Sequence, residues 1–168
     1  MDTNNHSISL NDAAQAFLNH SSIAVVGLSR GEDDTAKTIY TKLKSSGYTV
    51  YALHPTESEV KGIPCYPDFA ALPHPVEAVV VITKPIHVQD VLTQAHRAGV
   101  SWIWLHKSFG NSVDPIAVEL GRQKGLNIID GGCPMMHIEP VDSAHKCMKP
   151  VLQWTGRIPR RIPVFEDN

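Results

Sequence analysis

Five short apolar runs divide the chain into regular elements. Four of them are continuous rather than alternating, which is typical of strands covered on both faces of a parallel sheet. They lie at residues 23–26, 79–82, 102–105 and 126–129. The fifth run, at residues 48–53, mixes polar with β-branched and aromatic side chains and predicts a strand nearer the edge of the sheet.

Segments with helical character separate these runs and predict helices over residues 34–46, 86–98 and 112–124. Each is followed by a glycine, the residue that most easily adopts the left-handed conformation at a helix C-terminus. The three glycines are Gly47, Gly99 and Gly125. Because strands and helices alternate, we predict an α/β fold: a Rossmann-like, three-layer, doubly wound parallel sheet of about five strands. Only the proline-rich connection at residues 54–78 departs from this alternation, and it predicts a loop with at most a short helix near residues 68–72.

Both ends of the chain add to this core. Residues 1–20 predict an N-terminal helical extension, in which Leu10, Ala13 and Phe17 share one apolar face that covers a sheet edge or meets a partner. Residues 21–133 form the predicted Rossmann-type domain, and residues 134–168 a proline-rich extension packed on the same domain.

Charge and composition narrow the class of protein. The 15 lysines and arginines against 17 aspartates and glutamates give a net charge of −2, which argues against nucleic-acid or membrane-surface partners. The absence of a long apolar run and of a signal-peptide pattern predicts a cytoplasmic protein. Three cysteines, an odd number without paired spacing, do not suggest a disulfide framework.

A Gly-x-Ser-x-Gly turn at residues 27–31 follows the first predicted strand of the core and precedes a helix. Such a turn can bring a phosphate to the N–H groups of the helix N-terminus, although many α/β proteins need Gly27 there for packing alone. The acidic residues at positions 32–34 suit a capped helix start. A phosphate is therefore expected on the side of Ser29 and Arg30.

The next strand separates two classes of nucleotide. An NAD site expects a second glycine where this chain has Ser29, and a carboxylate at the end of the second strand, where this chain has His54. A phosphorylated ribose would instead need donors or cations, which His54, Thr56 and Lys61 supply. A nicotinamide-dependent oxidoreductase or sensor stays as the alternative.

Several segments together resemble a known family. In chain order they are AVVGLS, GYTVYALHP, KGIPCYPDFAALPHPVEAVVV, ITKP and GVSWIWLH. They resemble the CoA-binding domain family, small Rossmann-type proteins similar to the N-terminal domain of the succinyl-CoA synthetase α subunit, over about residues 20–133. The resemblance implies coenzyme A or an acyl-CoA as the ligand.

The resemblance also implies which loops bind that ligand. The turn after the first core strand would surround the CoA phosphates, His54-Pro55 would stand where such proteins have Asn-Pro beside the ribose, and the loops after the next two strands would complete the site. The expected contacts are Gly27, Leu28, Ser29, Arg30, Lys37, His54, Pro55, Thr83, Lys84, Pro85, Leu105, His106 and Lys107.

One departure concerns the 3′-phosphate of CoA. Thr56 replaces the lysine that often follows the Asn-Pro pair in the family. The candidates to replace that lysine are Lys37, Lys61, Lys84 and Arg30.

Catalysis in the related synthetases uses a phosphorylated histidine on a second domain, and only about 38 residues follow the last predicted strand here, too few for another such domain. We therefore expect noncovalent binding without ligase chemistry, no catalytic residue, a small-molecule nucleotide as partner, and a homodimer as an option.

Cys133, His137, His145 and Cys147 match no common zinc spacing, so we expect no metal there and a packed strap instead. A role for the Cys133 thiol beside a thioester is the less favoured alternative.

Overall fold

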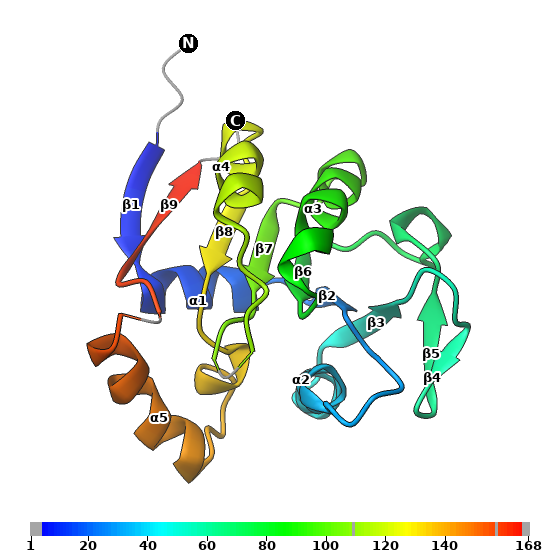
Figure 1. The fold of residues 1–168 in the computed structure, drawn as a ribbon, viewed down its shortest axis with the longest axis horizontal. Coiled ribbons are helices and arrows are strands. Elements are labelled where there is room, and N and C mark those ends of the chain that lie inside the picture. The colour runs from blue at the N-terminus through cyan, green and yellow to red at the C-terminus, as the bar shows by residue number, and fades with distance from the viewer. Residues whose placement is uncertain (1–4, 109, 157, 166–168) are drawn as a thin grey trace.

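A computed structural model of the protein describes residues 5–108, 110–156 and 158–165. The chain forms a seven-stranded sheet of order β4-β5-β3-β2-β6-β7-β8 with helices on both faces, and a separate two-stranded sheet (Figure 1). This confirms the predicted α/β, Rossmann-like fold.

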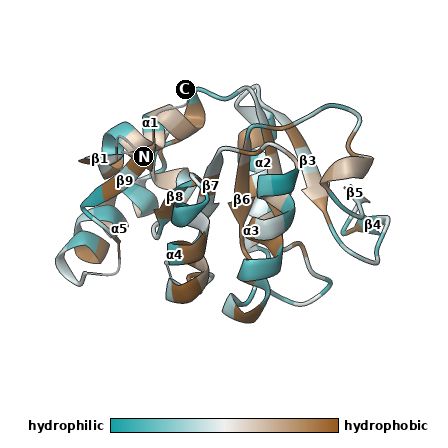
Figure 2. Ribbon diagram, turned by 90° about the horizontal axis from the view of Figure 1, so that it is seen from above, coloured by the Kyte–Doolittle hydropathy of each residue, from teal (hydrophilic) through white to brown (hydrophobic). Residues whose placement is uncertain are grey.

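The five predicted strands are five neighbouring parallel strands of the sheet. They are β2 (Ser22–Val26), β3 (Thr49–Leu53), β6 (Ala78–Val81), β7 (Trp102–Leu105) and β8 (Asn127–Asp130). Their side chains alternate between two apolar layers: Val80 faces one, and Val79 and Val81 face the other. Strands covered on both faces are continuously apolar, and Figure 2 shows this along β6.

The proline-rich connection is more regular than predicted. It contains β4 (Glu59–Val60) and β5 (Ile63–Tyr66), which form a short hairpin, and then the 3-10 helix η1 (Phe69–Ala71) that agrees with the expected short helix. Strand β5 pairs in parallel with β3 through only two residues. Such short strands, one of them containing Pro64, leave little periodic signal in a sequence.

The three predicted core helices are present. They are α2 (Thr35–Ser45), α3 (Val88–Arg97), preceded by the 3-10 helix η2 (Pro85–His87), and α4 (Pro115–Gln123). The predicted C-terminal glycines Gly47, Gly99 and Gly125 all have positive φ angles, of 94°, 79° and 83°. Helix α2 packs on one apolar layer, and α3 and α4 pack on the other, which completes the three layers.

The N-terminal helix α1 (Leu10–Leu18) lies on the same layer as α2. Its Phe17 ring meets the Trp104 ring of β7 edge to face, with centroids 5.3 Å apart. The predicted apolar face is thus buried against the sheet. The 3-10 helix η3 (Pro134–Met136) and helix α5 (Ser143–Trp154) follow β8, and Leu152 joins the same layer.

The two ends of the chain pair with each other, which the sequence did not predict. Strand β1 (Asn5–Ser9) is antiparallel to β9 (Arg161–Phe165). Parts of the two predicted extensions, residues 1–4, 157 and 166–168, lie outside the described residues. Within the described part of the chain, no helix has the length and the apolar run needed to cross a membrane.

Candidate functional site

The carboxyl ends of β2 and β6 mark the place where the order of the sheet reverses. From β2 the chain proceeds through α2 to β3 on one side, and from β6 it proceeds through α3 to β7 on the other. In open α/β sheets, ligands bind in the crevice that forms at such a point.

Two hollows occupy this crevice. The first, called here the β3-side hollow, has a volume of about 270 Å³ and includes Gly27, His54 and Thr83 in its wall. The second, the α2-side hollow, has a volume of about 190 Å³ and includes Asp33, Thr83 and His106. Thr83 therefore borders both hollows.

Gly27 is required by the packing of the turn after β2. Its φ angle is +124°, and a Cβ placed on it would lie 2.6 Å from the carbonyl carbon of Ile82. The amide of Ile82 in turn donates a 2.7 Å hydrogen bond to the carbonyl of Val26, which holds the two loops together. The glycine is thus explained by the close approach of two backbones, with or without a ligand.

Two of the cations considered for the 3′-phosphate are already paired. The Arg30 guanidinium lies 2.5 Å from a carboxylate oxygen of Glu57. Lys61 donates a 2.6 Å hydrogen bond to the carbonyl of Gly31 and forms an ion pair with Asp34. Both pairs tie the loop after β2 to the connection that follows β3.

The N-terminus of α2 holds a carboxylate of the protein itself. Asp33 accepts a 2.9 Å hydrogen bond from the amide of Thr35, the first residue of the helix. Hydrogen bonds from the side chain and the backbone of Thr35 lower the pKa of Asp33. Of the three acidic residues, Asp33 therefore serves the helix start as predicted, whereas the N-cap residue Asp34 makes no side-chain cap bond and pairs with Lys61. The carboxylate of Asp33 leaves the helix terminus less open to a ligand phosphate.

His54 has one ring nitrogen engaged. Its Nδ1 accepts the backbone N–H groups of Glu57 at 3.0 Å and of Thr56 at 3.4 Å. A neutral imidazole that accepts at Nδ1 carries its proton on Nε2. His54, in the wall of the β3-side hollow, therefore offers a hydrogen-bond donor through Nε2.

Thr83 carries an unsatisfied hydroxyl. Its Oγ1 is buried and has no hydrogen-bond partner among the described residues. Buried hydroxyls are nearly always hydrogen-bonded, so an exception at the junction of two hollows indicates a group that a ligand can satisfy.

His106 is 2% exposed, and its Nε2 lies 3.1 Å from the hydroxyl oxygen of Ser108. Burial lowers its pKa to about 4, so the ring is neutral at pH 7. The next residue, Lys107, is fixed by two backbone hydrogen bonds to Gly132, of 3.0 and 2.9 Å. Leu105 is fully buried in the layer covered by α3 and α4.

The structure brings only part of the predicted set together. The residues of the set that line one of the two hollows are Gly27, Leu28, His54, Pro55, Thr83, Lys84 and His106. The residues of the set that line neither are Ser29, Arg30, Lys37, Pro85, Leu105 and Lys107.

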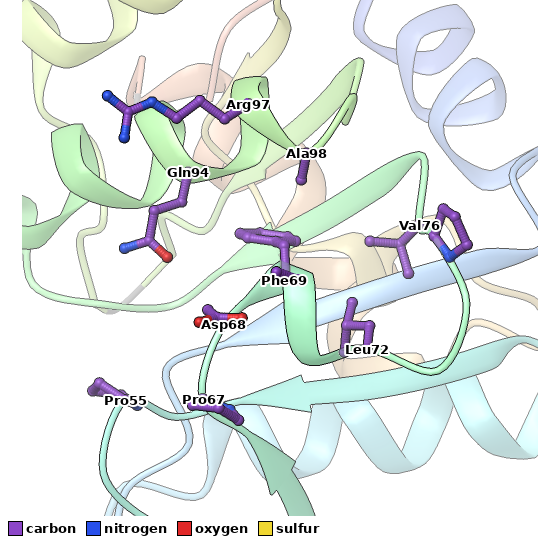
Figure 3. A pocket seen from close by; sticks show the side chains of 11 residues that line it. Pro55, Pro67, Asp68, Phe69, Leu72, Val76, Gln94, Arg97 and Ala98 are labelled. Atoms are coloured by element: carbon purple, nitrogen blue, oxygen red, sulfur yellow. The ribbon is translucent and has the colours of Figure 1, made fainter.

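Other lining residues were missed by the sequence interpretation. Asp68, Phe69, Asp90 and Gln94 line the β3-side hollow. A larger groove of about 740 Å³ adjoins it between α3 and the connection after β5, and Asp68, Phe69 and Gln94 belong to both (Figure 3). The prolines of that connection suggested a loop, but no pattern indicated that the loop would face the crevice.

The cysteines and histidines of the predicted strap lie apart from both hollows. Cys133 is buried, and burial raises the pKa of its thiol to about 12, so it holds no reactive thiolate. His137 packs against Trp104, and His145 pairs with Asp142 at 2.6 Å. Within the described residues, no three His, Cys, Asp or Glu side chains gather as metal ligands.

The fold and its crevice are those of a Rossmann-type α/β domain. Comparison with protein families goes further: the chain belongs to the CoA binding domain family, whose model matches residues 21–139. The resemblance suggested by the strand-end loops is confirmed.

Two curated relatives are ligases. The chain is 25% identical over 118 residues to acetate–CoA ligase [ADP-forming] I of Archaeoglobus fulgidus, a match of 66% of this chain and 17% of the ligase. It is 25% identical over 125 residues to the α subunit of acetate–CoA ligase [ADP-forming] II of Pyrococcus furiosus, a match of 70% of this chain and 27% of that subunit. The aligned region is thus a small part of each relative.

A solved structure of similar size supports the same fold. A hypothetical protein from Pyrococcus horikoshii OT3 superimposes with a TM-score of 0.69 and 27% identity, over 78% of this chain and 91% of that one.

Proposed function

We propose that this protein binds coenzyme A or an acyl-CoA noncovalently in the crevice at the ends of β2, β3 and β6. The observation that carries the proposal is the family match over residues 21–139, combined with an unsatisfied buried hydroxyl, Thr83 Oγ1, at the centre of that crevice. The adenosine occupies the β3-side hollow, and the pantetheine chain passes Thr83 toward the α2-side hollow.

The polar groups of the crevice support this orientation. His54 Nε2 supplies a donor to the ribose end, as argued from its Nδ1 contacts. Thr83 supplies a hydroxyl to the middle of the ligand. The α2-side hollow has neutral His106 and exposed Lys84 in its wall, a mixed environment that suits the amides of pantetheine.

Ligand binding is the whole of the proposed activity. The ligase activity named for the two relatives belongs to proteins of which the aligned region is 17% and 27%. A cytoplasmic location and a homodimer stay predictions.

Titration by calorimetry tests the proposal. CoA and acetyl-CoA should bind the purified protein saturably at one site per chain, and more tightly than NAD. The Thr83→Val variant should weaken CoA binding roughly tenfold, as expected for a lost hydrogen bond in a buried site. Thr38→Val, at an exposed position of α2, is the matched control and should bind like the wild type. Tighter binding of NAD, or no binding of any CoA compound, would refute the proposal.

A further inference from the structure

We propose that the ribose end of this site selects an adenine nucleotide with free 2′- and 3′-hydroxyls and discriminates against a 3′-phosphate, with Asp68 as the specificity-determining residue. The inference rests on the proposed function for the location of the nucleotide. It goes further by stating that 3′-dephospho-CoA binds at least as tightly as CoA.

Asp68 lies next to the end of β3 although it does not belong to that strand. Strand β5 runs parallel to β3, and the amide of His54 donates a 2.9 Å hydrogen bond to the carbonyl of Tyr66. The ends of the two strands are therefore adjacent, and Asp68, two residues after Tyr66, lines the same hollow as His54. The carboxylate missing from the end of β3 is thus supplied from the end of the neighbouring strand.

One oxygen of the Asp68 carboxylate is held by the backbone. Asp68 Oδ1 accepts a 2.9 Å hydrogen bond from the amide of Ala71, which holds the side chain at the start of η1. Its other oxygen has no hydrogen-bond partner among the described residues. A fixed carboxylate with a free oxygen accepts hydrogen bonds from ribose hydroxyls, as the acidic residue of a dinucleotide-binding fold does. His54 Nε2 provides a complementary donor at the same end.

No lysine or arginine occurs among the described residues that line the β3-side hollow, whereas a second carboxylate, Asp90, does. Arg30 and Lys61 are held by Glu57 and Asp34, as described above. A 3′-phosphate would therefore enter a region with two carboxylates and only the histidines His54 and His87 to face them.

Arg97 lines the adjoining groove and is therefore a cation to consider as a partner for a 3′-phosphate. Figure 3 shows its guanidinium extending away from Asp68, while Gln94 of the same helix extends toward the Asp68 side. Phe69 lines both spaces and offers a ring on which an adenine base can stack. The groove thus supports recognition of the adenine base. The Arg97 guanidinium does not point to the place where a 3′-phosphate would meet Asp68.

The test compares ligands that differ only at the 3′-position. Calorimetric titrations at low and high salt would use CoA against 3′-dephospho-CoA, and adenosine 3′,5′-bisphosphate against AMP, with NAD as a further arm. We expect the 3′-phosphorylated member of each pair to bind about threefold or more weakly at low salt, and the difference to shrink at high salt because repulsion is screened. A phosphate gripped by a cation would show the opposite salt dependence.

Two variants test whether charge at the ribose end causes the preference for a free 3′-hydroxyl, and two others serve as controls. Asp68→Asn keeps an oxygen for the Ala71 amide and removes the charge, so it should shift the affinity ratio toward CoA by roughly threefold to tenfold. Thr56→Lys restores the cation that the family often has and should make CoA the tighter ligand. Glu119→Gln is the matched control: it removes one negative charge from α4, outside both hollows, and should leave the ratio unchanged. Arg97→Gln should leave it unchanged as well.

The outcomes separate this inference from the proposed function. Tighter binding of CoA than of 3′-dephospho-CoA, or an unchanged ratio in Asp68→Asn, overturns the inference and leaves CoA binding intact. Binding of 3′-dephospho-CoA and AMP without binding of CoA supports the inference and contradicts the proposed function. Equal binding of NAD and 3′-dephospho-CoA supports selection of free hydroxyls and argues against recognition of the pantetheine. Binding of none of these nucleotides overturns both.

Discussion

The backbones of Gly27 and Ile82 approach so closely that a Cβ on Gly27 would lie 2.6 Å from the Ile82 carbonyl carbon. The two residues follow neighbouring parallel strands, β2 and β6; Gly27 lines the β3-side hollow and Ile82 lines the α2-side hollow. The turn that resembles a phosphate-binding loop is therefore also the contact that sets the spacing of the crevice walls.

Gly27→Ala is expected to destabilise the protein by about 3 kcal/mol or more, because the side chain meets immovable backbone and the φ angle of +124° is unfavourable for alanine. Urea denaturation followed by circular dichroism measures the change. Gly47→Ala is the matched control: it shares a positive φ angle of 94° but has no atom within 4 Å of the added Cβ. It should cost only about 1 kcal/mol. Similar losses in the two variants would contradict a role for the Ile82 contact.

Thr83→Val should leave the free energy of unfolding unchanged or raise it by up to about 1 kcal/mol. The reason is that Thr83 Oγ1 is buried without a partner, and a methyl group of similar size removes that unfavourable burial. Thermal denaturation without nucleotide measures the effect. A clear loss of stability would mean that the hydroxyl has a structural partner, and would weaken its assignment as a ligand contact.

Stability should fall as the pH decreases from about 6.5 to about 4. Burial lowers the pKa values of His106 and His137 from 6.5 to about 4 in the folded state, so in this window the unfolded chain binds protons that the folded chain does not. Each histidine contributes at most about 1.4 kcal/mol per pH unit. Urea titrations at several pH values measure the slope.

The variant His106→Gln should flatten that pH dependence. Ile103→Val is the control, because it removes buried volume at a cost of about 1 kcal/mol without removing a titrating group, and should keep the wild-type slope. If His106→Gln and wild type lose stability in parallel, the lowered pKa of His106 is wrong.

The attachment of the β1–β9 sheet to β8 should depend on the buried side-chain amide of Asn127. Asn127 of β8 accepts a 2.7 Å hydrogen bond from the amide of Phe165 through Oδ1, and its Nδ2 donates to the Phe165 carbonyl at 3.4 Å. Asn127→Ala should cost about 2 kcal/mol, because it leaves these backbone groups unsatisfied in a part-buried position. It should also speed amide hydrogen exchange in β1 and β9. Asn111→Ala, which removes one exposed bond to the amide of Val113, should have a smaller effect confined to its own loop.

Much of this architecture could be read from local pattern. Continuous apolar runs predicted four core strands because each is buried on both faces, and a glycine after each of α2, α3 and α4 predicted where that helix ends. The order of the strand-end loops was sufficient to indicate the family. These features depend on residues close together in the chain, so the sequence alone determined them.

The composition of the crevice was decided by contacts between distant residues. The pairs Arg30–Glu57 and Lys61–Asp34 each join residues 27 positions apart. In these pairs Arg30 and Lys61, which the sequence suggested as partners for a phosphate, are bound to carboxylates of the protein instead.

Other features depended on pairings that leave hardly any pattern in the chain. Asp68 lies in the same hollow as His54 only because β5 pairs with β3 through two residues, too few to produce periodicity. The pairing of β1 with β9 likewise joins the two ends of the chain. The sequence by itself determined the five core strands, the helices that follow them, and that the ends of these strands meet in one crevice. Only the tertiary structure decided which charges face that crevice, because that depends on side-chain pairing between segments with no local signal.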